Sequence, residues 1–412
     1  MTPEIEKRIK AVKVGRVPTG YKKTKVGIVP KEWNEVRFHD MFSRVTRKNK
    51  KGNTNVLTIS AQHGLINQNE FFNKTIASDD KSNYYLMEKG EFAYNKSYSN
   101  GYPFGALKRL DYYDKGIVSP LYICFAANEN NKYPDFYVHY FEAGLMNREI
   151  QAFAQEGARN HGLLNISVDD FFNSNLLNPP LSEQKKIAEI LSAQDKIIEL
   201  KEKLIAEKQR QKKYLMQMLL GEKTKSILVL NGVVIDKSRW KKFDFEYVIQ
   251  KFACKKTPIL SSDYLETGAI PIVDQGQNYV VGYTNNRSAK IECPKSGLIV
   301  FGDHTRIFKF IDFDFAIGAD GTQLLELKML GITKFFYYML CNVDIPNNGY
   351  NRHFKYLKEL SLAFPTLPEQ QAIAAVLSSA DEEISLLQRD LEQEKLKKKS
   401  LMQLLLTGLV RV

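Results

Sequence analysis

The sequence predicts an α+β protein that consists of two tandem α+β domains, each followed by a long helix. Two observations lead to this fold class. A stretch of about 42 residues with helical periodicity occurs twice, from Pro179 and from Pro365, and each copy follows a segment of short apolar runs that begins near a tryptophan, Trp33 or Trp240. The length of 412 residues also exceeds that of one ordinary domain.

Residues 1–29 form a basic N-terminal segment, in which Glu4–Val14 fits a short helix. The first domain covers residues 30–178 and opens at Trp33. Its interior is rich in Asn, Gly, Tyr and Phe, with short apolar runs separated by turn residues, which favours strands joined by long loops. Strands are predicted at Val56–Ser60, Gly90–Asn95 and Ile117–Phe125, and short helices at His39–Arg44, Phe136–Leu145 and Asp169–Leu177.

One polar, aromatic loop of the first domain suits contacts with nucleic acid. It runs from Asn95 to Tyr102 and precedes Lys108 and Arg109. Amide and hydroxyl groups bind base edges, cationic side chains bind phosphates, and tyrosine rings stack on bases. The alternative is an ordinary surface loop whose tyrosines pack inward. The predicted contacts are Lys96, Tyr98, Asn100, Tyr102 and Arg109, together with Arg159 from a second polar turn.

Residues 179–221 predict one uninterrupted central helix. Ser182 suits its start, Glu183 complements the positive N-terminal end of the helix dipole, and Gly221 suits its stop. A helix of this length is typical of a coiled-coil strand or a spacer, although a long surface helix on one domain has the same pattern. Its apolar stripe consists of Ile187, Leu191, Ile198, Ile205, Leu215 and Leu219.

A connector, residues 222–236, leads to the second domain at residues 237–364. Trp240 stands 207 positions after Trp33, whereas the two helices stand 186 positions apart, so the second domain is about 21 residues shorter. The loop Phe301–Arg306 combines a glycine turn with several hydrogen-bond donors, and a solvated turn is the alternative. The predicted strands are Ile270–Val273, Leu298–Phe301 and Gln323–Leu327, and the predicted DNA contacts are Arg287, His304, Thr305, Arg306 and Arg352.

The C-terminal helix, within residues 365–412, repeats the central one. Shifted by 186 residues, the two stretches align without a gap and share 18 identities over about 42 positions. Any two amphipathic helices share an apolar stripe, but the matches of Gln184 with Gln370 and of Asp195 with Asp381 are polar, which indicates a true internal repeat. The second stripe consists of Ile373, Leu377, Ile384, Leu387, Leu391, Leu401 and Leu405.

The composition favours an anionic partner. Lysine and arginine number 59 against 47 acidic residues, which gives a net charge of +12 and a pI of about 9.2. Such a balance is typical of nucleic-acid binding, although it also serves solubility. The sequence contains no apolar run of membrane-spanning length, and its N-terminus lacks the apolar core of a signal peptide. The four scattered cysteines suit reduced thiols in the cytoplasm better than disulfides or zinc.

The motifs predict a binding protein with neither catalytic residues nor a metal site. Asn178-Pro179-Pro180-Leu181 resembles the Asn-Pro-Pro-aromatic motif of adenine methyltransferases, but Leu181 cannot stack on a flipped base. The sequence contains no F-x-G-x-G cofactor loop and no P-loop. Asp320 with Glu326 and Lys328 resembles a nuclease metal site only through a pattern that arises often by chance. The six histidines lack ligand spacing.

The whole chain resembles the specificity (S) subunit of a type I restriction–modification enzyme. The resemblance rests on two variable domains, each closed by a near-identical long helix. Leu181–Ala188 and Leu367–Ala374 are close to that family's helix opening, P-L-P-x-E-Q-x-x-I-A. Ser119–Tyr122 and Phe301–Arg306 resemble strings common in its recognition domains, whereas the opening at Trp240 lacks the family's Pro-x-x-Trp form.

The resemblance implies a DNA sequence-recognition subunit that is not itself an enzyme. Each target-recognition domain would read one half of a bipartite, asymmetric site in double-stranded DNA, and the two helices would pair antiparallel as a coiled-coil-like spacer. Two methyltransferase (M) subunits and restriction–translocase (R) subunits would dock, in part on the apolar stripes. These partners would carry S-adenosylmethionine, ATP and magnesium, so no cofactor is expected on this chain. Two other interpretations stay open: a stand-alone, repressor-like DNA-binding protein, or the targeting part of a fused restriction–methylation enzyme.

Overall fold

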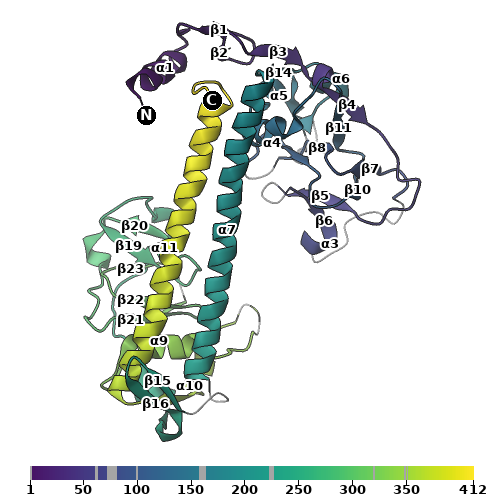
Figure 1. The fold of residues 1–412 in the computed structure, drawn as a ribbon. Coiled ribbons are helices and arrows are strands. Elements are labelled where there is room, and N and C mark those ends of the chain that lie inside the picture. Colours follow the sequence, from purple (N-terminus) through teal and green to yellow (C-terminus); the bar gives the residue numbers. More distant parts are fainter. Residues whose placement is uncertain are drawn as a thin grey trace. The chain divides into compact units, whose positions relative to one another are not determined.

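The computed structural model describes residues 2–60, 64–71, 81–98, 101–156, 164–221, 227–318, 321–347, 349 and 351–412. The chain divides into two compact units, one made of Met1–Leu200 with Leu391–Val412 and the other of Lys201–Asp390. Each unit contains one α+β domain and parts of both long helices, which are α7 (Leu181–Leu220) and α11 (Leu367–Leu405) (Figure 1).

The first unit is built on a four-stranded antiparallel sheet in the order β4-β11-β8-β9. These strands are β4 (Phe42–Val45), β11 (Ile123–Ala127), β8 (Phe92–Asn95) and β9 (Ala106–Arg109). The strand pairs around the sheet are β1 (Tyr21–Lys23) with β2 (Ile28–Pro30), β3 (Asn34–Arg37) with β14 (Asn175–Asn178), β5 (Leu57–Ser60) with β6 (Gly64–Asn67), β7 (Tyr85–Glu88) with β10 (Lys115–Val118), and β12 (Gln155–Glu156) with β13 (Leu164–Asn165). The helices are α1 (Pro3–Lys13), α2 (Phe38–Met41), α3 (Gln68–Phe71), α4 (Pro134–Glu142), α5 (Asn147–Phe153) and α6 (Val168–Phe172).

Aromatic side chains form the main core of the first unit. Phe38 packs with its ring centroid within 5.0 Å of those of Phe42, Phe125 and Phe171. Because strand side chains alternate between faces, Phe92 and its neighbours on one face join this core, while the other face closes a smaller core of its own. The long helices complete the main core through Ile187, Leu191, Leu405 and Leu406.

The second unit repeats this plan, with a four-stranded sheet in the order β18-β24-β21-β22. These strands are β18 (Ile249–Lys251), β24 (Thr322–Leu327), β21 (Leu298–Gly302) and β22 (Phe308–Ile311). The other strands are β15 (Ile227–Leu230) with β16 (Val233–Asp236), β17 (Lys241–Asp244) with β25 (Ser361–Phe364), and the sheet of β20 (Gly282–Thr284), β19 (Ile270–Val273) and β23 (Ala316–Ile317). The helices are α8 (Phe245–Val248), α9 (Thr333–Cys341), α10 (Phe354–Lys358) and the 3₁₀ turns η1 (Lys237–Arg239), η2 (Ser261–Asp263) and η3 (Arg287–Ala289).

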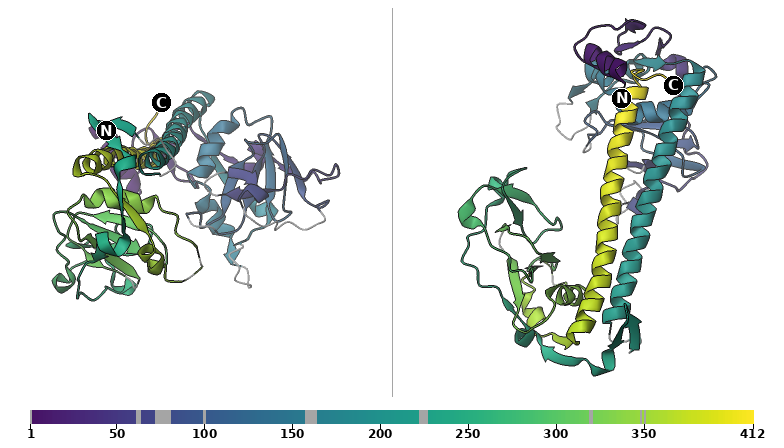
Figure 2. Two further views of the ribbon diagram at one scale, coloured as in Figure 1. Left: turned by 90° about the horizontal axis from the view of Figure 1, so that it is seen from below. Right: turned by 60° about the vertical axis from the view of Figure 1, so that its left-hand side comes forward.

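The repeat begins earlier in each half than the tryptophans suggest. The hairpin β1–β2 precedes Trp33, and the hairpin β15–β16 precedes Trp240, so the basic segment 1–29 and the connector 222–236 contain equivalent elements. In the first unit the two chain ends lie close together (Figure 2), where the Arg8 Nη1–H donates to the Leu409 carbonyl at 2.8 Å.

The two long helices pair antiparallel, which confirms the predicted fold class. In the first unit the Gln194 amide donates to Glu394 at 2.6 Å, and in the second unit Lys208 pairs with Glu383 at 2.6 Å. The partner's number on α11 falls as the number on α7 rises, so the helices run in opposite directions (Figure 1). Further ion pairs cross between the helices at Lys212–Asp381 and Lys398–Asp195.

Three predicted elements differ from the structure. Ile117–Phe125 is not one strand, because β10 ends at Val118 and β11 begins only after Pro120, which has no N–H for a sheet ladder. Asp169–Leu177 is not one helix, because α6 ends at Phe172 and the chain then extends as β14 to pair with β3. The helix predicted at His39–Arg44 is the single turn α2, after which β4 joins the sheet.

Candidate nucleic-acid interface

The loop predicted to read DNA in the second unit is a tightly built hairpin between β21 and β22. The Arg306 N–H donates to the Gly302 carbonyl at 2.7 Å, and Arg306 takes the left-handed conformation, with φ of 63°. The Thr305 hydroxyl donates to the Gln275 carbonyl at 2.5 Å, and the His304 N–H donates to Gln275 Oε1 at 3.2 Å. A Cβ on Gly302 would lie 2.1 Å from the Thr305 hydroxyl oxygen, so this close approach requires glycine.

A buried aspartate joins this hairpin to a second segment. The Asp303 carboxylate accepts the Phe354 N–H at 2.7 Å, and its carbonyl oxygen accepts the His353 N–H at 2.9 Å. The Arg306 Nη1–H donates to the Ile345 carbonyl at 2.9 Å. The hairpin therefore adjoins Ile345 and the segment 351–354, and the two-segment surface that they form brings His304, Thr305 and Arg306 together with exposed Arg352.

The predicted loop of the first unit occupies the same place in the repeat, between β8 and β9. The Lys96 carbonyl accepts the Leu164 N–H at 3.0 Å, which ties the loop to the segment before α6, as Asp303 ties the second loop to the segment before α10. Tyr98 is 62% exposed, and burial lowers the pKa of half-buried Lys96. Two predicted contacts, Asn100 and Arg159, lie outside the described residues.

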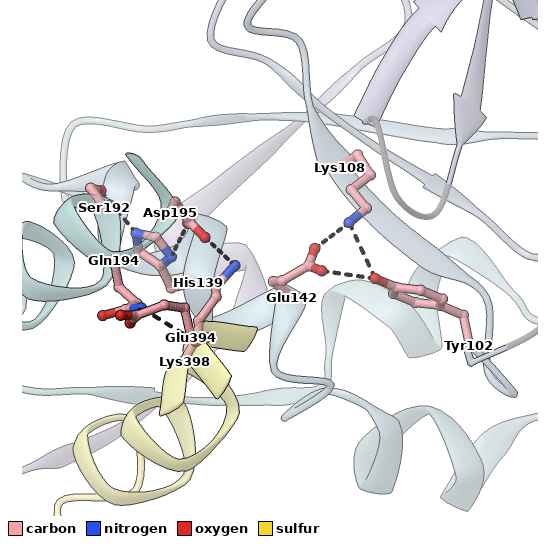
Figure 3. A network of polar contacts seen from close by, with 9 residues as sticks. All are labelled: Tyr102, Lys108, His139, Glu142, Ser192, Gln194, Asp195, Glu394 and Lys398. Atoms are coloured by element: carbon pink, nitrogen blue, oxygen red, sulfur yellow. Dashed lines mark hydrogen bonds and ion pairs between the residues drawn. The ribbon is translucent and has the colours of Figure 1, made fainter. Parts of the chain in front are cut away.

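Tyr102 and Arg109 lie in ion-pair networks inside the first unit. The Tyr102 hydroxyl donates to Glu142 Oε1 at 2.8 Å, and Lys108 pairs with the same carboxylate (Figure 3). Burial disfavours the charged form of Glu142, but Lys108 outweighs it and holds the pKa of Glu142 below its usual range. Arg109 pairs with Asp111 at 2.7 Å and also with Asp135. The polar groups of these two predicted contacts therefore join β9 to α4.

Arg287 lies on a different element from the β21–β22 hairpin. It begins η3 and is exposed, and η3 follows β20, which belongs to the three-stranded sheet rather than to the β21–β22 hairpin. Gln275 and Asp303 hold the second loop in shape, yet sequence reasoning did not single them out. Asp303 stands inside the string Gly302–Arg306, whereas nothing in the sequence marks Gln275.

The apolar stripes of the long helices are divided among three environments. Ile187, Leu191 and Leu405 lie in the first core, and Leu219, Ile373 and Leu377 lie in the second. Between them, the buried side chains are Ile205, Ile384 and Leu391. The half-buried side chains are Ile198, Leu215, Leu387 and Leu401.

The motif Asn178-Pro179-Pro180-Leu181 forms the start of α7. The Gln184 amide donates to Asn178 Oδ1 at 2.7 Å and to the Pro179 carbonyl at 2.8 Å. In the second repeat the Gln370 amide donates in the same way to the Pro365 carbonyl at 2.9 Å. The repeated glutamines therefore fix the turn by which the chain enters each long helix.

Two features are absent from the described residues. Across the ranges that the structure describes, no three His, Cys, Asp or Glu side chains gather as a metal site. None of the described helices is both long enough and apolar enough to cross a membrane.

Known proteins resemble this chain over most of its length. The family model for the type I restriction modification DNA specificity domain matches residues 30–209 and 237–396. The chain is 24% identical to the putative type I restriction enzyme MjaX specificity subunit of Methanocaldococcus jannaschii, over 95% of this chain and 97% of that protein. It is 30% identical over 86 residues to the EcoR124I/EcoR124II specificity subunit of Escherichia coli, which is 20% of this chain and 21% of that one. Among solved structures, the S subunit of a type I restriction–modification system from M. genitalium has a similar fold, with a TM-score of 0.55 and 14% identity over 90% of this chain and 96% of that one.

Proposed function

Because this chain belongs to the family of type I restriction–modification specificity subunits, we propose that it reads a bipartite, asymmetric site in double-stranded DNA. One observation carries the proposal. Each unit presents the same two-segment surface, a hairpin loop joined to the segment before α6 or α10, but the two surfaces carry different side chains. Equivalent surfaces with unlike residues suit two unlike half-sites.

The chemistry of each surface fits a different kind of contact. In the second unit, His304 and Arg352 supply hydrogen-bond donors, and Arg306 adds positive charge. In the first unit, exposed Tyr98 offers a ring for stacking or a hydroxyl for a base edge. Base-edge contacts carry sequence information, whereas contacts to phosphate fix position and register. The net charge of +12 then supplies the affinity that does not depend on sequence.

The partners proposed for this chain are two M subunits and R subunits, which hold S-adenosylmethionine, ATP and magnesium, in the cytoplasm where the DNA lies. Exposed leucines on the long helices support docking. Leu200 of α7 is 52% exposed in the first unit, and Leu386 of α11 is 60% exposed in the second. Large apolar side chains at that exposure are favourable sites for partner helices, since covering each would remove apolar surface from water.

The test uses the full-length chain, alone and co-expressed with M subunits from the same source. Rounds of selection from random double-stranded DNA should enrich two short motifs at one fixed separation. A methyltransferase should copurify with the chain, and DNA methylation should require it. Enrichment of a single continuous motif, by the chain alone and by the complex, would contradict the bipartite mode. Methylation by the chain without M subunits would show that it is itself the enzyme.

A further inference from the structure

A cluster of polar side chains joins three helices in the first unit (Figure 3). Asp195 of α7 pairs through Oδ1 with Lys398 Nζ of α11 at 2.5 Å. Its other oxygen, Oδ2, lies 3.7 Å from Nδ1 of His139, which comes from α4 of the recognition domain. His139 Nε2 is 3.0 Å from the hydroxyl of Ser192, one helical turn before Asp195. One carboxylate thus contacts the opposite helix and the domain helix at the same point.

The second unit contains the same cluster, built from the other copy of the repeat. Asp381 of α11 pairs through Oδ1 with Lys212 Nζ of α7 at 2.5 Å. The hydroxyl of Tyr338, on α9, donates to Asp381 Oδ2 at 2.7 Å and lies 3.4 Å from the hydroxyl of Ser378. Lys212 Nζ also lies 5.5 Å from the centroid of the Tyr338 ring. Here the carboxylate joins α11, α7 and α9.

The correspondence between the clusters is complete. Serine, aspartate and lysine in one cluster stand 186 positions from those in the other, with the two long helices exchanging roles. His139 and Tyr338 are each the sixth residue of a nine-residue helix, α4 or α9. The interval from aspartate to lysine is 17 residues on α7 and 17 residues on α11. Equal intervals let both clusters form in one register of the helix pair.

The position of these clusters distinguishes them from ordinary surface ion pairs, which contribute little to stability. The Asp195 and Asp381 side chains are 41% and 37% exposed, but their partners are less so: His139 is 5% exposed, Lys398 19% and Lys212 21%. A slip of one helical turn would move the lysine by about 5.4 Å and break the contact. The pair Lys208–Glu383 also crosses between the helices, but it involves α7 and α11 only. The cores and the tryptophan bonds also hold each domain to the pair, but the two clusters join the domain helix to both long helices at one point.

We propose that Asp195 and Asp381 are positioning residues for DNA recognition, each of which holds its recognition domain at one angle and one axial position on the helix pair. The consequence is a single preferred spacing between half-sites. This inference rests on the proposed bipartite function. It assigns the spacing between half-sites to the two polar clusters as well as to the length of the helices.

The sharpest variant is Tyr338→Phe, which removes the hydroxyl bond to Asp381 and keeps the ring. Tyr337→Phe is the matched control, because it removes a neighbouring hydroxyl of the same helix whose hydrogen-bond partner is Cys341 rather than Asp381. Full-length variants, with M subunits where these are required for binding, are compared on DNA with the selected half-sites at the preferred spacing and at one base pair more or fewer. We expect Tyr338→Phe to lower the affinity ratio between preferred and altered spacing at least threefold, with both half-site sequences unchanged. Tyr337→Phe should preserve the ratio.

Equal loss of affinity at every spacing would overturn the proposal, since that is the result of a merely structural role. Amide hydrogen exchange provides a readout without DNA: exchange in α9 should rise in Tyr338→Phe and stay unchanged in Tyr337→Phe. No rise in Tyr338→Phe would show that the joint does not exist. If the wild-type chain selects no bipartite site, the proposed function fails and the spacing role fails with it, while hydrogen exchange still decides whether Tyr338 holds α9 to α11.

Discussion

Trp33 and Glu183 are 150 positions apart, yet the indole N–H of Trp33 donates to the Glu183 carboxylate at 3.3 Å. The second repeat makes the same bond, from the Trp240 indole to Glu369 at 3.1 Å. Each bond joins the residue just before β3 or β17 to the first turn of the long helix that follows that domain. In the first unit, Arg411 from the C-terminal tail also binds Glu183, with its Nε–H at 2.8 Å.

Replacing Glu183 by Gln should destabilise the first unit by about 1–3 kcal/mol, because a buried acceptor is weakened and Arg411 loses one of its two charged partners and keeps only Glu32. Urea unfolding gives the free energy, and hydrogen exchange shows which unit opens. Glu369→Gln is the matched variant, and its exchange should rise in the second unit instead. An equal rise of hydrogen exchange in both units for either variant would contradict the conclusion that Glu183 stabilises the first unit and Glu369 the second.

Replacing His304 and Arg352 by Ala should relax one half of the target only, by about 1–3 kcal/mol for each lost base contact. Replacing Lys96 and Tyr98 should affect the other half. Selection from random DNA, followed by binding to single-base variants of the selected site, measures the sequence preference at each half. Arg306→Ala is less informative, because Arg306 also holds the Ile345 segment. Relaxation of both halves by one pair of changes would show that these loops are not separate readers.

A heptad inserted after Gln211 and another after Lys397 should shift the preferred spacing. Both insertions fall between the aspartate and the lysine of the polar clusters and lengthen both intervals equally. The added helix of about 10.5 Å corresponds to about three base pairs, over which the duplex turns by roughly 100°. Binding at the native spacing should collapse while circular dichroism stays helical. Insertion into one helix alone should lower the unfolding midpoint, because the two intervals between aspartate and lysine no longer match. An unchanged spacing preference in the folded double insertion would falsify the proposal that the helices set the spacing between half-sites.

The stability of the first unit should depend on pH through His139. Burial lowers the pKa of His139, and the opposing effect of Asp195 does not outweigh it. As the pH falls below about 6.5, the unfolded chain takes up a proton at this histidine that the folded chain does not. The contribution of neutral His139 to the free energy of unfolding is therefore complete above that pH and is lost as the pH falls below it. The loss cannot exceed about 1.4 kcal/mol per pH unit. His139→Gln should remove this part of the dependence of unfolding free energy on pH, measured by urea unfolding between pH 8 and 5.5.

The sequence was sufficient to predict the repeat, because helical periodicity and polar identities are local signals. The structure gives those identities a reason: Gln184 and its copy fix the helix start, and Asp195 and its copy join three helices. The two loops were identified from composition alone, and they occupy equivalent places in the fold. The sequence could not show that Tyr102 and Arg109 pair with carboxylates, because Glu142 and Asp135 come from a helix that the fold brings to them.

The first unit is built from two separate segments of the chain, and this has a consequence for folding during synthesis. Its last part, Leu391–Val412, supplies Leu405 and Leu406 to the core and Arg411 to Glu183, whereas the second unit is one continuous segment. Domains made first on the ribosome ordinarily fold first. Here the first unit is completed only by residues 391–412, which are synthesised after the whole of the second unit. Translation that stops before residue 391 therefore leaves the first unit without Leu405, Leu406 and Arg411, while the second unit has all of its segments.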